Sequence, residues 1–213
     1  MSEIRFGRLR WYRAVGILAA TACLLFATPK VFAGGGNVIP PTAKVKGYSL
    51  AEAAASTAYF NEGPHTPDTV PSGFPFQILY VPADGDLTFN VRTGTMFYVP
   101  LVYSDSTDSA FWPFPDVTNA EAVSDYYFDT AQLGAEVMDV IVDGEITSLA
   151  RKYAAGAVTP GLPSGGSSYT VVAAFLAPLT KGSHTVTLRV LLNGAFLGGG
   201  EFEFETTYTV NVN

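Results

Sequence analysis

The feature that most constrains the fold of this chain is a predicted strand that is apolar on both faces. It lies within residues 92–105, and its side chains alternate between Phe97, Val99, Leu101 and Tyr103 on one face and Met96, Tyr98 and Val102 on the other. Such a strand has to be buried between two layers. Gly94 is expected to form the turn before it, and Pro100 predicts a bulge or an edge position.

Other segments predict further strands. The clearest is residues 202–212, where Phe202, Phe204, Tyr208, Val210 and Val212 alternate with Glu203, Glu205, Thr207, Thr209 and Asn211. About eight such strands predict a mainly β fold, an antiparallel β-sandwich of the jelly-roll or Ig-like type. Capping boxes at Ser49–Glu52 and Thr118–Glu121 predict two short helices, one ending near Asn61 and packing across one end of the sheet, the other over residues 119–133.

Two further segments have clear local signals. Val137–Val142 and Glu145–Thr147 flank Asp143-Gly144, which predicts a β-hairpin with a type I′ turn. Residues 154–168 are rich in Gly, Ser and Pro and are predicted to form a loop.

Residues 1–33 have the pattern of a secretory signal peptide. Four arginines between residues 5 and 13 precede an apolar run from Ala14 to Ala27, and Val31-Phe32-Ala33 is a typical cleavage site. The alternative, a membrane anchor, needs roughly 20 apolar residues, more than this run has. We therefore expect cleavage after Ala33, a secreted or periplasmic protein, and no membrane span in the mature chain.

Charge and cysteine content exclude several classes of protein. Residues 1–33 hold five of the twelve basic residues and one of the nineteen acidic ones, which leaves 7 basic and 18 acidic residues. So acidic a domain repels nucleic acid and anionic lipid. The only cysteine, Cys23, lies inside the apolar run and not at its end, so no lipid anchor is expected. The mature chain then has no disulfide and no thiolate ligand.

The predicted domain organisation has three parts. Residues 1–33 are the leader, residues 34–47 an extended arm, and residues 48–213 a single β-sandwich domain. The glycines and prolines of the arm forbid a helix there. The arm is either a frayed lead-in or a strand that pairs with a neighbouring subunit.

Three fragments carry a resemblance to known proteins. They are Thr-Gly-Thr-Met-Phe-Tyr-Val-Pro at 93–100, Val-Asp-Gly at 142–144, and Ala-Pro-Leu-Thr-Lys-Gly-Ser-His-Thr-Val at 177–186. Together they resemble a loose group of exported microbial β-sandwich proteins of unassigned function, over residues 48–212. The chain lacks the group's tryptophan-rich first helix, having Ala53 to Ala58 there, and it lacks the group's cysteines. The resemblance implies the fold and no activity.

The loop at residues 104–117 is the predicted ligand-binding surface. It combines large apolar groups with carboxylates: Phe111, Trp112, Phe114, Asp108 and Asp116. Aromatic rings beside carboxylates can stack on sugar rings or contact a protein partner. The alternative is that the aromatic residues fold back over one end of the core.

Calcium is the only cofactor that the sequence indicates. Asp84 and Asp86 lie in one turn, and Asp105 and Asp108 in another, so both offer the oxygen ligands that calcium prefers. Neither turn has the spacing of an EF-hand.

No catalytic motif is present in the sequence. His65 and His184 with a carboxylate are one candidate metal site, and the alternative is that His184, at the start of a strand, hydrogen-bonds the turn before it. We therefore predict a non-catalytic protein that binds a ligand or surface partner, most plausibly carbohydrate, through residues 104–117. One alternative is a carbohydrate-active hydrolase or lyase that uses paired carboxylates. Another is a structural subunit that assembles through residues 34–47.

Overall fold

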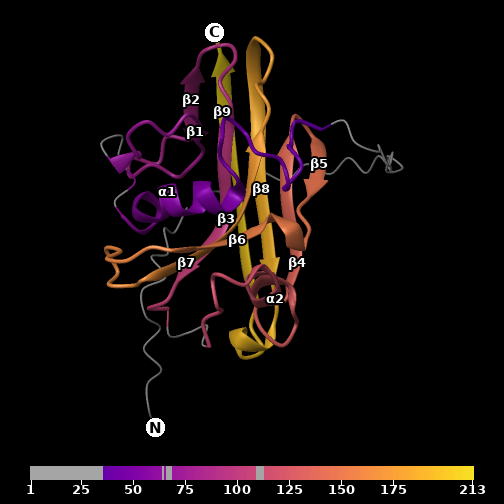
Figure 1. Ribbon diagram of the computed structural model, residues 1–213. Helices are drawn as coiled ribbons and strands as arrows, with labels where there is room; N and C mark the ends of the chain where they lie inside the picture. The colour runs from indigo at the N-terminus through magenta and orange to yellow at the C-terminus, as the bar shows by residue number, and fades with distance from the viewer. Residues whose placement is uncertain (1–35, 64, 66–68, 109–112) are drawn as a thin grey trace, which may run out of the picture. The chain divides into compact units, whose positions relative to one another are not determined.

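Two β-sheets packed face to face, with two short α-helices, make up the fold. The computed structural model describes residues 36–213 except residues 64, 66–68 and 109–112 (Figure 1). Residues 36–213 form one compact unit. The predicted leader, as well as Phe111 and Trp112, lies outside the described residues.

The predicted mainly β sandwich is confirmed. The four-stranded sheet has the order β1 (Gln77–Ile78), β3 (Phe97–Asp105), β7 (Ser168–Leu176) and β6 (Ala154–Val158). The five-stranded sheet has the order β2 (Thr88–Val91), β9 (Phe202–Val212), β8 (Gly182–Leu192), β4 (Ala135–Val142) and β5 (Glu145–Ser148). Neighbours are antiparallel except for the short edge strands β1 and β2, which run parallel to β3 and β9.

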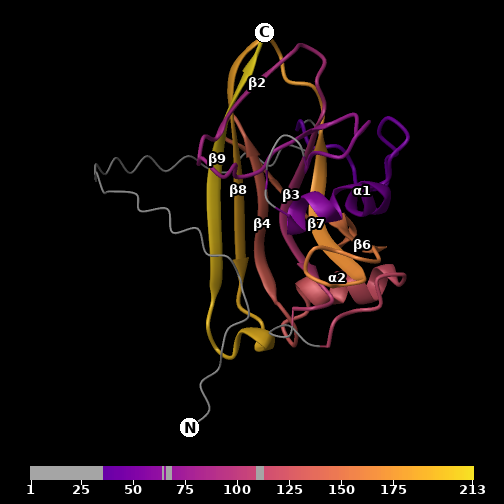
Figure 2. The same cartoon turned by 90° about the vertical axis from the view of Figure 1, so that its left-hand side faces the viewer.

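Both faces of the four-stranded sheet are covered, which explains the two-faced apolar strand. Its inner face packs on the five-stranded sheet, and α1 (Leu50–Glu62) contacts β6 and β7 on its outer face. Figure 2 shows the resulting layers: the five-stranded sheet, the four-stranded sheet and then α1. The prediction that this helix packs across one end of the sheet is therefore wrong. The side chains of Ala53, Ala54 and Ala58 are buried and small, so this face of the helix can approach the sheet closely.

A β-bulge changes the predicted alternation of β3. The pairing with β7 shifts register between Pro100 and Val102, as the proline predicts. Phe97 and Val99 face the inter-sheet core as expected. After the bulge Val102 packs against that inner core, while Tyr103 packs on the α1 side. The prediction that Tyr103 shares a face with Phe97 is therefore wrong, because the extra residue reverses the order of the faces.

The second helix, α2 (Ala120–Phe128), starts and ends differently from the prediction. Its N-cap is Asn119, whose side chain accepts hydrogen bonds from the backbone N–H groups of Glu121 and Ala122. The helix ends at Phe128, with Asp129 as its C-cap, several residues earlier than expected.

The predicted hairpin of β4 and β5 is confirmed. Asp143 and Gly144 have φ angles of 50° and 85°, as a type I′ turn requires. The loop predicted at 154–168 instead contains β6, preceded by the short 3₁₀-helix η3 (Arg151–Tyr153). Another short 3₁₀-helix, η4 (Ala195–Leu197), joins β8 to β9. In β9, Phe202 and Phe204 pack against the core and Glu203 and Glu205 are exposed, so the predicted register holds.

Candidate functional site

The last residue of β3 lies at the centre of a polar cluster. Asp105 is buried, with 6% of its surface exposed. Its Oδ1 accepts hydrogen bonds from the backbone N–H and the hydroxyl of Thr107, both at 2.6 Å. The Ser164 hydroxyl also bonds the Asp105 carboxylate. This end of β3 therefore holds one carboxylate in a fixed orientation.

Three segments converge on this carboxylate. Glu62, the last residue of α1, is hydrogen-bonded to Asp105 through its carboxyl group. The Ser106 hydroxyl accepts from the backbone N–H groups of Ser167 and Ser168, at 3.0 and 3.3 Å. A Cβ atom at Gly166 would lie 2.9 Å from Asp105 Oδ1, so only a glycine leaves room for the carboxylate. The end of α1, residues 104–108 and the loop 159–167 therefore form one surface, which we call the acid-pair site.

The pKa values of Glu62 and Asp105 are shifted in opposite directions. Burial, the Asp105 charge, the hydrogen bond to Asp105 and the Asp108 charge together raise the pKa of Glu62 to about 8. Burial opposes ionisation of Asp105 as well, but the hydrogen bonds from Thr107 outweigh it and lower the pKa of Asp105. At neutral pH the pair is therefore a neutral acid donating to a carboxylate.

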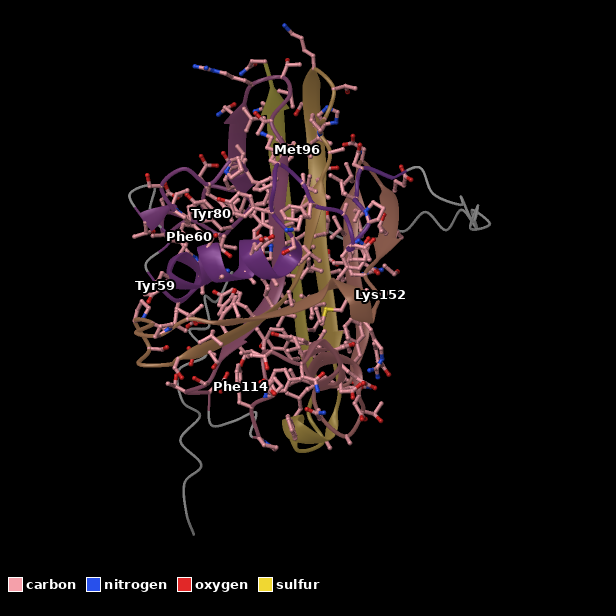
Figure 3. All side chains as sticks on the ribbon, in the orientation of Figure 1. Tyr59, Phe60, Tyr80, Met96, Phe114 and Lys152 are labelled. Carbon is pink, nitrogen blue, oxygen red and sulfur yellow. The ribbon has the colours of Figure 1, made fainter. Side chains whose placement is uncertain are left out.

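An exposed aromatic residue lies on the same surface. Tyr59 precedes Glu62 by one turn of α1 and is 47% exposed. Its hydroxyl donates to the carbonyl of Pro160 in the loop 159–167. Figure 3 shows Tyr59 on the side of the molecule where the connection between β6 and β7 projects. The acid-pair site thus combines carboxyl groups, hydroxyl groups and an accessible ring.

Two of the predicted loop residues have structural contacts instead. Phe114 is half-buried and packs edge-on against Tyr126, with ring centroids 5.6 Å apart (Figure 3). Asp116 Oδ1 accepts from the N–H and the hydroxyl of Thr118, at 2.9 and 2.7 Å, in the turn that leads into α2. Phe114 therefore fits the alternative that the aromatic residues fold back over the core, and ligand binding by Phe111, Trp112, Phe114, Asp108 and Asp116 remains a prediction.

The predicted calcium ligands fall in two turns. Asp84 Oδ1 accepts from the N–H of Asp86 at 3.1 Å, and Asp86 Oδ1 accepts from the N–H of Thr88 at 2.9 Å. Asp105 and Asp108 belong to the acid-pair site. Within the described part of the chain, no three or more His, Cys, Asp or Glu side chains are grouped so that they could hold a metal ion. Calcium binding remains a prediction.

The two histidines have separate surroundings. His65 places its ring nitrogens near the carbonyls of Val81 and Asn61. His184 Nδ1 lies 2.6 Å from Asp143 Oδ2, and its Nε2 lies 2.8 Å from the carbonyl of Thr180. Both neighbours of His184 are acceptors, and the hydrogen bonds to Asp143 and to the Thr180 carbonyl raise the pKa of His184. This contact joins the Val-Asp-Gly turn to the Pro-Leu-Thr-Lys-Gly-Ser-His turn, and it gives those two motifs a structural role.

Glu62 is the charged residue of the acid-pair site that sequence reasoning missed. In the sequence it belongs to the Asn-Glu-Gly-Pro stretch that ends α1, where a polar residue is ordinary. Its partner Asp105 lies 43 positions later, and no local pattern connects the two. Only the three-dimensional packing of α1 on the four-stranded sheet brings them together.

Comparisons with protein-family models, with curated proteins and with solved structures found no match. In the part of the chain that the structure describes, no helix is long and apolar enough to cross a membrane.

Proposed function

We propose that this chain is an exported, non-catalytic binding protein whose ligand is a carbohydrate, bound at the acid-pair site. The observation that carries the proposal is the hydrogen-bonded pair of Glu62 and Asp105 on a surface with an exposed ring. Sugars present rows of hydroxyl groups that both donate and accept. The pair leaves acceptor oxygens on both carboxyl groups for the hydroxyls that donate, and the Tyr59 ring offers a face for stacking.

The separation of the two carboxyl groups favours binding over glycoside hydrolysis. Hydrogen-bonded oxygens lie about 3 Å apart. Retaining glycosidases need carboxyl groups about 5 Å apart, and inverting ones need more, to make room for the sugar or for water. The direct hydrogen bond between Glu62 and Asp105 leaves no room for a glycosidic bond between the two groups. Their differing pKa values are nevertheless those of an acid and a base, so hydrolysis remains the alternative to be tested.

The assembly alternative has less support. Residues 37–39 run beside the end of β7, where the N–H of Ile39 donates to Phe175 and the N–H of Ala177 donates to Asn37, both at 2.8 Å. These backbone groups are already bonded within the chain.

The test is a glycan binding screen on the purified mature protein, with and without calcium, in which released sugar is also measured. We expect saturable binding without turnover. Binding should weaken about tenfold in Glu62→Ala and Asp108→Ala, since each removes carboxyl oxygens that accept from sugar hydroxyls. Glu136→Ala, which removes an exposed acid in β4, is the matched control and should bind as the wild type does.

Two results would contradict the proposal. One is the absence of binding to any glycan under both conditions. The other is release of sugar that Asp105→Asn abolishes while binding persists, which would favour the hydrolase.

Export is tested separately: N-terminal sequencing of secreted protein should return Gly34-Gly-Gly-Asn, and a sequence starting at Met1 would contradict cleavage after Ala33.

A further inference from the structure

A hollow of about 360 Å³ lies beside the N-terminus of α2. Its walls come from α2, from η3 and the first residue of β6, and from the segment before α1 that contains Thr42. The lining residues are Thr42, Ala120, Glu121, Ser124, Arg151, Lys152 and Ala154. Figure 3 shows Lys152 on the opposite side of the view from Tyr59, so this hollow is distinct from the acid-pair site.

The hollow gathers two of the few basic residues of the chain. Arg151 is ion-paired with Asp125, one turn further along α2 from Glu121. Lys152 is exposed and, among the described residues, has no ion-pair partner. The N-terminus of α2 adds a positive potential at the same place. One positive charge in the hollow is therefore left without an internal counterion.

A buried hydroxyl is the second, independent observation. Ser124 is only 8% exposed, and its Oγ has no hydrogen-bond partner within the described part of the chain. It lies four residues after Ala120, so both project from the same face of α2, and both line the hollow. Leaving a buried hydroxyl unbonded is unfavourable. Rotation about the Cα–Cβ bond of Ser124 would let the hydroxyl donate to a ligand oxygen in the hollow.

We propose that this hollow binds a small monocarboxylate that carries hydroxyl groups, such as a uronic acid. The carboxylate pairs with Lys152 and accepts from the Ser124 hydroxyl at the positive end of α2. Glu121, on the same wall, accepts from sugar hydroxyls and repels anions of higher charge such as phosphate. The proposal concerns a different surface from the acid-pair site and does not depend on it.

The test is a titration of the purified mature protein with glucuronate, glucose and inorganic phosphate, followed by ¹⁵N–¹H correlation spectra. We expect saturable shifts at residues 120–124 and 151–154 with glucuronate, with a dissociation constant of about 1 mM, as befits one charge-assisted contact on an open surface. Glucose, which lacks the carboxylate, should give none there, and phosphate should bind more weakly than glucuronate.

Variants locate the contact. Lys152→Met should weaken glucuronate binding about tenfold and Ser124→Ala severalfold, because each removes one partner of the carboxylate. Lys181→Met removes another exposed lysine with no ion pair among the described residues, and it should leave binding unchanged. The proposal is overturned if glucuronate causes no saturable shift, if phosphate binds as tightly, or if Lys152→Met binds like Lys181→Met. Because Lys152 is exposed, its loss should not unfold the protein.

Discussion

The proton between Glu62 and Asp105 links the acid-pair site to stability. Glu62 titrates near 4.5 in the unfolded chain, and the folded state raises this pKa to about 8. Between these values the folded state keeps a proton that the unfolded state has released. The free energy of unfolding should therefore fall as pH rises from about 4.5 to about 8.

Chemical denaturation across this pH range measures the effect. Glu62→Gln keeps a donor toward Asp105 but cannot titrate, so its stability should depend less on pH than that of the wild type. Glu136→Gln, with an exposed side chain, should keep the wild-type slope. Equal slopes in all three proteins would mean that Glu62 does not hold the proton.

His184 and Asp143 should stabilise the fold in a different pH window. The hydrogen bond from Asp143 raises the pKa of His184, and although burial of Asp143 opposes its ionisation, the bonds from His184 and Thr185 lower its pKa. The histidine contribution is complete below about 6.5 and is lost as pH rises through its folded pKa. The aspartate contribution is present above about 3.8 and is lost as pH falls through its lowered pKa.

The pair should therefore contribute most near pH 5 to 6, by about 1 kcal/mol. The stability difference between the wild type and His184→Gln should be largest there and shrink toward pH 9. In an Asp143→Asn background the same substitution should have little effect, since the partner is already lost. A difference that does not change with pH would contradict a charged pair.

At the scale of elements, β6 depends on the absence of a side chain at one position. A Cβ at Gly156 would lie 2.6 Å from the carbonyl oxygen of Val117 and 2.9 Å from Cγ2 of Val123. Backbone atoms cannot move aside easily, so Gly156→Ala should destabilise the protein by about 1–3 kcal/mol. Gly200→Ala is the control, because the nearest atom to a Cβ there would be 3.3 Å away. This substitution should therefore change the free energy of unfolding little. Urea unfolding of both variants measures the difference, and equal midpoints would contradict the close packing of α2 on β6.

The same packing explains which elements the sequence could predict. The strands of the five-stranded sheet have one exposed face, so their alternation is visible, and β9 and the β4–β5 hairpin match the prediction. In contrast, β6 is Ala-Ala-Gly-Ala-Val, where small residues are needed because α1 and α2 pack on it. Small residues have low strand propensity, and the segment therefore looked like a loop.

The candidate site was only partly predictable for a related reason. From the sequence, Asp105 is predicted as an oxygen ligand for calcium in a turn, and not as the partner of Glu62 at the end of β3. The position of Glu62 beside Asp105 depends on long-range packing, which no local pattern indicates. Asp116 and Phe114 have structural contacts in the segment that leads into α2. Such a segment can have the same acidic and aromatic composition as a binding loop, so composition alone does not distinguish the two.

At the scale of the whole domain, the two sheets differ in what covers them. The outer face of the five-stranded sheet carries polar cross-strand pairs, including Thr187 with Thr207 at 2.8 Å and Asn90 with Asn211 at 3.1 Å. Arg189 and Asp139, at 2.6 Å, extend this polar surface toward β4. The four-stranded sheet is covered by α1, and the acid-pair site lies where α1 ends. Ligand binding is thus expected at the edge of the covered layer and not on the open sheet face.

The most direct test of this account is to map the bound ligand on the domain. The protein is titrated with the neutral glycan that binds best in the screen, and the backbone amide shifts are assigned. The account predicts that the largest shifts lie in residues 59–62, 104–108 and 161–167, and that they shrink in Glu62→Ala. Shifts centred on Thr187 and Thr207 of the open sheet face, or the absence of any binding glycan, would contradict it.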